Sequence, residues 1–327
     1  MQIQQITDLI NKLDPKTAVL LCHHNADPDA LGSAFAFSGL LKRLKPDLKT
    51  EIAAATGPSR LGKTMVDSLP LTLVDLPQIE SADLIVLLDT NTIQQLDDWS
   101  TKIPSGHPLV VIDHHASHPE TERIATILVA DDTASSTCEI VYRLYKQANY
   151  TPTLDEAKAL FLGIAFDTRH FIIASSETLK VIAKLADAGV NPQETLPILS
   201  LPMEHSERIA RLKAGTRVKL LNLNDWLIAL SNVSAYQSSA ARGILALGAH
   251  VAVVAGKNGT KIQVSFRATN DFYEKTKIHV GTDLAKPLGE FMGGMGGGHS
   301  VSAGANGEGT VDAALKFCEK LIKKKLK

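Results

Sequence analysis

The sequence contains little cysteine and no excess of charge of either sign. Its 327 residues include three cysteines with no Cys-x-x-Cys spacing among them, which argues against a disulfide framework and fits a reducing compartment. Lysine and arginine total 34 against 35 acidic residues, for a net charge of −1. This balance argues against a protein that coats duplex DNA or a membrane surface, although it permits a local basic groove.

Long hydrophobic runs are also missing. No apolar segment approaches the roughly 20 residues of a membrane span. The first residues, MQIQQITDLINKLDP, lack the basic start and apolar centre of a signal peptide. We therefore expect a cytoplasmic protein without membrane contacts. Hydrophobic residues nevertheless make up 44% of the chain, enough for a large core, and the length favours about two domains.

Short apolar runs alternate with amphipathic stretches in the first half of the sequence. The apolar runs, typical of strands buried on both faces, span 17–21, 84–89 and 109–113. The amphipathic stretches, which predict helices, span 30–44, 136–148 and 154–168. This alternation predicts an α/β domain with a parallel sheet and helices on both faces. In such sheets ligands bind at the carboxyl ends of the strands.

A change of pattern near residue 188 predicts a second domain. We expect residues 1–188 to form the first domain, 189–214 a linker with a connecting helix, and 215–327 a smaller α/β domain. In this second domain the pattern predicts strands at 217–223, 226–231, 251–256 and 261–268, a helix near 236–247, a glycine-rich loop at 293–298 and a final helix.

Ionisable side chains follow each predicted strand of the first domain. The residues concerned are His23, Asp27 and Asp29 after the first strand, Asp89 after the second, and Asp113, His114 and His115 at the third; Asp167 follows a predicted helix. Taken singly, each motif has a simpler interpretation, such as Asp29 as a helix cap. Their joint occurrence at three strand ends favours a single polar cluster.

Electrostatics indicates what such a cluster would hold. Two carboxylates about 4 Å apart repel by roughly 4 kcal/mol at an effective dielectric constant near 20, so four of them require raised pKa values or bound cations. Two divalent ions would balance the four aspartates. Mixed carboxylate and imidazole ligands suit Mn²⁺, with Mg²⁺ as an alternative. A pair of such metals is a common arrangement for phosphoester hydrolysis.

Five segments, taken together, resemble the successive motifs of the DHH phosphoesterase superfamily. They are HHNADPDALGS, LLDTN, VIDHHAS, GIAFDTRHF and GGGHSVSAGA, and the last resembles the DHH-associated C-terminal domain. The resemblance extends from about residue 17 to residue 305 and is strongest to the nanoRNase and 3'-phosphoadenosine-5'-phosphate phosphatase type. One departure is visible, because Ala26 replaces the usual proline and Pro28 stands between the two aspartates.

The resemblance implies a set of site residues in the first domain. The implied metal ligands are His23, Asp27, Asp29, Asp89, His114 and Asp167. Asp89 would bridge both metals and, with His115 and Asp113, belong to the catalytic group: His115 would lie beside the metals and the substrate phosphate, and Asp113 would orient an imidazole. The family spacing selects His23 over its neighbour His24, which we expect to be structural.

The resemblance also implies substrate contacts in the second domain. Arg267 in VSFRA is the candidate phosphate ligand, since guanidinium binds phosphate in a bidentate manner. Gly297, Gly298 and His299 would contact the nucleotide or its phosphate, because glycine permits close backbone approach. Arg169, after Asp167, is a further substrate-binding candidate, with a structural ion pair as an equal alternative; the same alternatives apply to His170.

The implied activity is metal-dependent hydrolysis of short single-stranded oligonucleotides or of 3'-phosphoadenosine 5'-phosphate by two-metal activation of water. Cyclic di-adenylate, a linear dinucleotide or another small phosphomonoester are alternative substrates. A non-enzymatic alternative is an inactive nucleotide-binding scaffold, but all six implied ligands are present. We expect no stable binding of duplex DNA, and a homodimer is left open.

Overall fold

The computed structural model describes residues 2–259 and 261–326. The chain divides into two compact units, Met1–Leu201 and Pro202–Lys327, so the division falls inside the segment expected to be a linker. The short helices α8 (Pro192–Thr195) and η3 (Leu196–Leu199) of that segment belong to the first unit. Helix α9 (His205–Thr216) belongs to the second.

The first unit is built on a five-stranded sheet in which every strand pair is parallel. The strands, in the spatial order β2-β1-β3-β4-β5, are β1 (Thr17–Cys22), β2 (Lys49–Ala54), β3 (Leu84–Leu88), β4 (Leu109–Asp113) and β5 (Ile127–Ala130). The prediction of a parallel sheet is confirmed. The two edge strands, β2 and β5, were not predicted, because KTEIAA starts with charged residues and ILVA is only four residues long.

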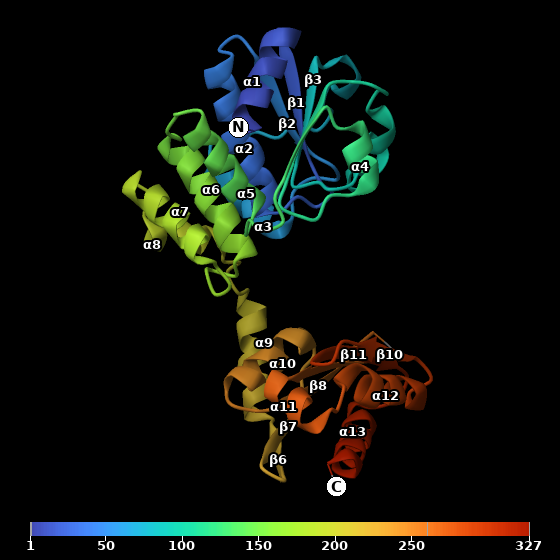
Figure 1. Ribbon diagram of the computed structural model, residues 1–327. Coiled ribbons are helices and arrows are strands. Elements are labelled where there is room, and N and C mark those ends of the chain that lie inside the picture. The colour runs from blue at the N-terminus through green and yellow to red at the C-terminus, as the bar shows by residue number, and fades with distance from the viewer. Residues whose placement is uncertain (1, 260, 327) are drawn as a thin grey trace. The chain divides into compact units, whose positions relative to one another are not determined.

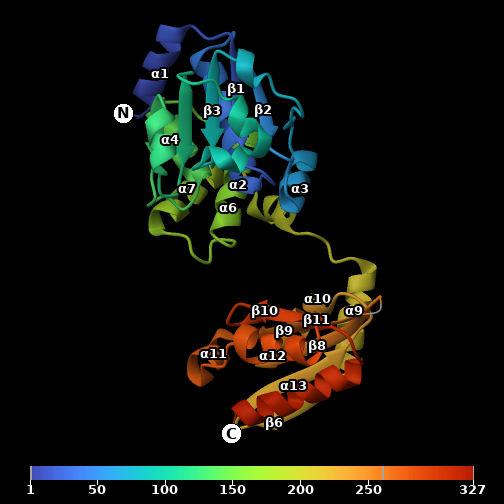
Figure 2. The same ribbon diagram turned by 90° about the vertical axis from the view of Figure 1, so that its right-hand side faces the viewer.

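Helices cover both faces of this sheet (Figures 1 and 2). One face packs against α1 (Gln2–Leu13), α2 (Pro28–Leu44) and α5 (Thr137–Gln147), while α6 (Leu154–Asp167) packs on α2 and α5, and α7 (Ser176–Asp187) packs on α5 and α6. The other face packs against the 3₁₀ helices η1 (Ile79–Ser81) and η2 (Ile93–Lys102) and against α4 (Pro119–Ile124). Helix α3 (Arg60–Ser68) follows β2. The strands are apolar at successive positions because both faces are buried.

The second unit contains a six-stranded mixed sheet in the order β10-β11-β9-β8-β7-β6. Its strands are β6 (Lys219–Leu223), β7 (Trp226–Asn232), β8 (Val251–Asn258), β9 (Lys261–Ala268), β10 (Met295–Gly298) and β11 (Ser302–Gly307). One face packs against α9 and α10 (Gln237–Ala246). The other packs against α11 (Asn270–Thr276), η4 (Val280–Ala285), α12 (Lys286–Phe291) and α13 (Val311–Lys325). The second α/β domain is confirmed.

The glycine-rich segment is not a loop throughout, so that prediction was wrong. Residues 295–298 form β10 and pair with β11. A Cβ atom on Gly296 would lie 1.8 Å from the carbonyl oxygen of Ala285, so glycine is required here for close packing rather than for flexibility. Within residues 2–259 and 261–326, no helix combines the length and the hydropathy needed to cross a membrane.

Candidate metal centre

The predicted ligands lie at one edge of the first sheet. His23 follows β1, Asp89 follows β3 and His114 follows β4, and these three strands are adjacent. Asp27 and Asp29 lie at the start of α2. The last residue of α6, Asp167, completes the set. The cluster therefore forms because parallel strands end at the same edge.

Two overlapping groups of side chains make up the cluster. Around His23, the Nε2 atom lies 3.8 Å from Asp27 Oδ2 and 3.7 Å from Asp89 Oδ2. Around His114, Nε2 lies 3.1 Å from Asp167 Oδ2, 3.6 Å from Asp89 Oδ1 and 4.0 Å from Asp29 Oδ2. The two oxygens of Asp89 thus face different groups. This geometry suits a carboxylate shared between two cations.

The residues of the cluster fit a divalent cation. Asp29 is fully buried and the Asp89 side chain is 3% exposed, so bulk water hydrates neither carboxylate. The Nε2 atom of His114 is buried and forms no hydrogen bond among the described residues, although Asp167 Oδ2 lies 3.1 Å from it. An imidazole nitrogen without a partner among carboxylate oxygens is a donor set for a first-row divalent metal.

The pKa values show the electrostatic cost of the metal-free cluster. Burial, together with repulsion from Asp167 and Asp89, raises the pKa of Asp29 well above its usual range. Burial and repulsion from Asp89 raise the pKa of Asp27 to about 6. Burial opposes ionisation of Asp89, but hydrogen bonds with His115 and His23 outweigh it and lower its pKa. Asp29 above all, and Asp27 to a smaller extent, therefore need cations nearby to be fully ionised at neutral pH.

Helix N-termini hold two of the carboxylates in place. Asp27 is the N-cap of α2, where its Oδ1 atom accepts from the amides of Asp29 and Ala30 at 2.9 and 3.1 Å. The fully buried carboxylate of Asp29 accepts from the amides of Thr137 and Cys138 at 2.7 and 2.9 Å, at the start of α5. The helix cap near this position is thus Asp27 rather than Asp29, and Asp27 Oδ2 remains free to face His23.

Thr137 is a cluster residue that sequence reasoning missed. Its hydroxyl donates to Asp89 Oδ1 at 2.9 Å and accepts from the amide of His114 at 3.3 Å, while its own amide donates to Asp29. One buried threonine thus contacts three members of the cluster. The available signal was its place immediately after the N-cap Ser136 of α5, but a hydroxyl at a helix start has many other functions.

Replacing Thr137 with valine should lower metal affinity and kcat/KM by about 10–100-fold, the usual effect of losing a side chain that orients a ligand. The valine keeps the backbone bond to Asp29 but loses the hydroxyl bond to Asp89. Activity titrated with Mn²⁺ measures both quantities. The variant Thr137→Ser keeps the hydroxyl and should retain most of the parental metal affinity and activity. Equal behaviour of the valine and serine variants would contradict this role.

His115 and Asp113 form a pair beside the cluster. The Nδ1 atom of His115 lies 2.8 Å from Asp113 Oδ1 and 3.5 Å from Asp89 Oδ1. Hydrogen bonds with Asp113 and Asp89 raise the pKa of His115 to about 11, so the imidazole is a cation at neutral pH. Asp113 is buried and His115 is half exposed. A buried carboxylate thus holds one ring nitrogen of an imidazole that is half exposed.

His24 lies outside the cluster. Its Nδ1 atom lies 3.0 Å from the carbonyl oxygen of Gln95 and 3.6 Å from Asp97 Oδ1, and its amide donates to Gln95 as well. These contacts connect the loop after β1 to η2.

Arg169 and His170, which follow α6, are exposed. Neither forms a side-chain hydrogen bond or ion pair within the described ranges. The ion pair considered for them is absent there.

The candidate substrate-binding residues of the second unit differ in how free they are to contact a ligand. Arg267 on β9 donates to the hydroxyls of Ser238, at 2.8 Å, and Ser302, and its buried Nε atom has no partner in the described part of the chain. Gly297 and His299 are exposed, and a Cβ atom on Gly297 would meet nothing within 4 Å. In contrast, a Cβ on Gly298 would lie 2.5 Å from the Ser302 carbonyl oxygen, so this glycine serves the packing of β10.

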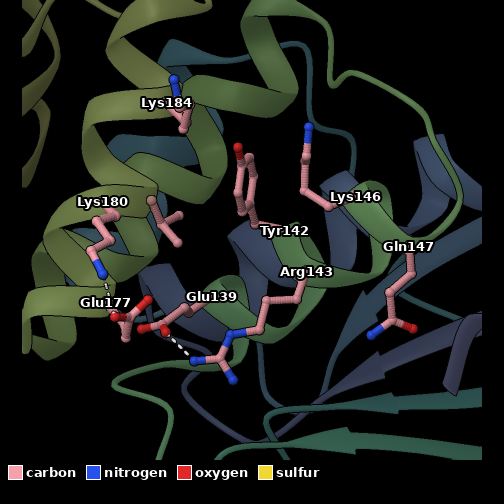
Figure 3. Close-up of a pocket in the computed structure, with 9 residues that line it drawn as sticks. Glu139, Tyr142, Arg143, Lys146, Gln147, Glu177, Lys180 and Lys184 are labelled. Atoms are coloured by element: carbon pink, nitrogen blue, oxygen red, sulfur yellow. Dashed lines mark hydrogen bonds and ion pairs between the residues drawn. The ribbon is translucent and has the colours of Figure 1, made fainter. Parts of the chain in front are cut away.

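A hollow of about 540 Å³ lies between α5 and α7 (Figure 3). Most of its charged groups have an ionic partner: Arg143 binds Glu139 and, outside the hollow, Asp131, and Lys180 binds Glu177 at 2.5 Å. Lys184, also in this hollow, pairs with an aspartate at 3.1 Å. Since these charges are already compensated, the hollow offers less for an ionic ligand than the strand-end cluster.

Comparison with known proteins decides the family. The model described as "DHH family, N-terminal domain" matches residues 17–164, and the "DHHA1 domain" model matches residues 232–324. An uncharacterised protein of Methanocaldococcus jannaschii is 32% identical over 304 residues, which cover 91% of this chain and 89% of the relative. The chain belongs to the DHH family. As a DHH protein, it is a hydrolase of the phosphoesterase superfamily.

Two further similarities bear on the branch and the fold. The DHH chain is 27% identical over 241 residues to the bifunctional oligoribonuclease and PAP phosphatase NrnA of Bacillus subtilis, covering 72% of this chain and 68% of NrnA. An exopolyphosphatase-related protein from Bacteroides fragilis matches in structure with a TM-score of 0.63 at 21% identity, covering 98% and 96% of the two chains. The latter likeness shows a shared fold alone. The predicted superfamily and its nanoRNase-type similarity are confirmed.

Proposed function

We propose that this DHH protein is a metal-dependent phosphoesterase that hydrolyses short oligonucleotides, and 3'-phosphoadenosine 5'-phosphate as a related substrate. The observation that carries the proposal is the strand-end cluster, in which Asp89 faces two groups of ligands and His114 Nε2 has no hydrogen-bond partner among the described residues. The substrate class is supported by the printed activities of the Bacillus subtilis relative.

In this proposal two divalent cations, Mn²⁺ first and Mg²⁺ second, occupy the cluster. His23, Asp27 and Asp89 would hold one cation, and Asp29, His114 and Asp167 the other, with the second oxygen of Asp89 beside His114. Bound metals would activate water and neutralise charge on the phosphoryl oxygens. The fully buried carboxylate of Asp29, fixed by two backbone amides, keeps the ligand geometry constant.

His115 and Asp113 serve the substrate phosphate in this proposal. Asp113 fixes one ring nitrogen of His115 and keeps the imidazole protonated. The other ring nitrogen can then donate a hydrogen bond to a phosphoryl oxygen as negative charge develops there. Asp113 therefore acts by positioning and charging His115 rather than by contact with the substrate.

The second unit is proposed to bind the nucleotide through Arg267, Gly297 and His299. The described part of the chain offers Arg267 only hydroxyl partners, so its guanidinium remains available for a phosphate. Gly297 has open space around its α-carbon, which lets a ligand approach the backbone. Gly298, also a candidate, contributes through the packing that fixes this strand.

Activity on a substrate panel tests the proposal. The Mn²⁺-loaded protein is assayed with a 5'-phosphorylated dinucleotide, a longer RNA, 3'-phosphoadenosine 5'-phosphate and cyclic di-adenylate, and kcat/KM is compared. We expect the dinucleotide and 3'-phosphoadenosine 5'-phosphate to be hydrolysed far faster than the long RNA. Preference for cyclic di-adenylate or for the long RNA would overturn the proposed substrate class.

Replacing Arg267 with alanine should raise KM for the dinucleotide about 10–100-fold, because hydrogen bonds to a charged group contribute roughly 1.5–3 kcal/mol. The value of kcat should change less, since the metal cluster lies in the other unit. Steady-state kinetics separates the two constants. Arg217→Ala, an arginine that contacts Asn232 instead, is the matched control. An unchanged KM would remove Arg267 from phosphate binding.

A further inference from the structure

The segment after Asp167 has an unfavourable backbone conformation. Arg169, His170 and Phe171 have φ angles of 51°, 56° and 70°. Three consecutive non-glycine residues thus lie in the left-handed region, which side chains with a Cβ atom rarely adopt. Such conformations persist where the surrounding structure enforces them, and they concentrate at functional sites.

Local bonds hold this segment firmly against the end of α6. The amide of His170 donates to the carbonyl of Ala165 at 2.7 Å. Thr168 accepts two further hydrogen bonds. Its hydroxyl accepts from the amide of Phe171 at 3.2 Å, and its carbonyl oxygen accepts from the amide of Ile173 at 3.1 Å. The Phe171 ring also packs edge-on against Phe161, with ring centroids 5.4 Å apart. The conformation is therefore anchored in the core.

What this anchored segment presents to solvent is unusual. Ile172 is 82% exposed and Ile173 is 58% exposed, and exposure of adjacent branched apolar side chains forgoes the free energy of burying them. Arg169 and His170 beside them are exposed, with no side-chain bond or ion pair among residues 2–259 and 261–326. Two apolar side chains and the Arg169 guanidinium thus lie close together in the sequence, exposed and without partners among the described residues.

The location connects the segment to the candidate metal centre. Asp167, two residues before Arg169, lies 3.1 Å from His114 in the cluster. The hydrogen bond from the amide of Ile173 to the carbonyl of Thr168 holds the backbone of Ile173 beside the residue that directly follows Asp167. A ligand with a phosphate at the cluster and a flat apolar group next to it would meet both features.

We propose that Ile172 and Ile173 form an apolar platform for a nucleobase, and that Arg169 contacts a phosphate of the same nucleotide. This inference rests on the proposed function and adds the recognition of the base. A nucleobase has an apolar face that fits against branched side chains, and a guanidinium suits the adjoining phosphate. The strained backbone is then explained as the conformation that presents these three side chains together.

The test uses 2-aminopurine riboside 5'-monophosphate, which has one fluorescent base and one phosphate and is a product-like ligand with no internucleotide bond. Fluorescence titration with the Mn²⁺-loaded full chain gives Kd. We expect the double variant Ile172→Ser/Ile173→Ser to raise Kd about tenfold, equivalent to losing about 1.4 kcal/mol, and to reduce the change in fluorescence. Inorganic phosphate should bind the variant as well as it binds the parent protein.

Controls separate this inference from its alternatives. Leu76→Ser removes a leucine that is 78% exposed in the loop before η1 and should leave Kd unchanged. An unchanged Kd in the double variant, or an equal loss of inorganic phosphate binding, would overturn the platform. The platform would also be overturned if sedimentation velocity showed that the parent protein is a dimer and the double variant a monomer, while the nucleotide Kd stays the same. Failure of the proposed function shows separately, as absence of dinucleotide hydrolysis by the parent protein.

Discussion

Replacing Asp89 with asparagine is expected to lower kcat/KM for the dinucleotide by about a thousandfold or more, equivalent to roughly 4 kcal/mol of transition-state stabilisation. The substitution keeps the size of the side chain but removes its charge. Asp89 is the residue whose two oxygens face His23 on one side and His114 on the other, so neither group of ligands remains complete. It also lies at a left-handed φ of 54°, which asparagine tolerates.

The matched control for this prediction is Asp98→Asn on η2, an exposed aspartate outside the cluster, which should retain parental activity. Circular dichroism of the Asp89 variant should match that of the parent protein, so that loss of activity is not loss of fold. Turnover by the Asp89 variant within tenfold of the parent would show that this carboxylate is not shared by catalytic metals.

The second large effect is on stability, and it depends on pH. In the metal-free protein the pKa of Asp27 is raised to about 6 and that of His23 to about 9. For His23, burial opposes the shift, but the hydrogen bond with Asp89 outweighs it. In both cases the folded protein holds its proton more tightly than the unfolded chain. The free energy of unfolding should therefore fall as pH rises from about 4 toward 9.

The pKa values set the approximate size of this loss in the free energy of unfolding. A pKa near 6 against an unfolded value near 3.9 corresponds to about 3 kcal/mol lost for Asp27 alone between pH 4 and pH 6. Asp89 does not offset this loss, since its pKa is lowered and its contribution is already complete above pH 4. Divalent cations replace the protons, so added Mn²⁺ should stabilise the protein more at pH 8 than at pH 5.

Thermal unfolding with EDTA and with saturating Mn²⁺, across pH 5 to 8, measures this effect. At a free metal concentration a thousand times Kd, one bound ion adds about 4 kcal/mol, which for a unit of this size corresponds to a rise in Tm of roughly 10 °C. A metal-induced rise in Tm that is the same at pH 5 and pH 8, or is absent, would contradict the electrostatic account of the cluster.

The sequence was sufficient to predict the centre of the sheet and the side chains that follow it. Strands β1, β3 and β4 have apolar residues at successive positions because both their faces are buried, and the polar residues at and after their ends stand out for that reason. The choice of His23 over His24 rested on the motif spacing that the family resemblance implies, and the structure separates the two imidazoles, with His24 bonded to Gln95.

Features that depend on tertiary contacts could not be predicted in this way. Thr137 joins three cluster residues only because the start of α5 meets the ends of β3 and β4. Strand β10 could not be predicted because its glycines are typical of loops. The reason for glycine at position 296 is a tertiary contact, the close approach of the Ala285 carbonyl oxygen. The left-handed segment after Asp167 had little signal either, since Arg169 and Phe171 are not residues that favour positive φ and a single histidine between them is a weak indication.

Calorimetric titration with Mn²⁺ of the parent protein, His23→Ala and His24→Ala tests the central claim most directly, because these adjacent histidines differ chiefly in their relation to the cluster. The account predicts two bound ions for the parent protein and for His24→Ala. For His23→Ala it predicts that binding of one of the two ions is lost or strongly weakened. Parental binding in His23→Ala, or no binding of Mn²⁺ by the parent protein, would contradict the claim that the strand-end cluster holds the metals.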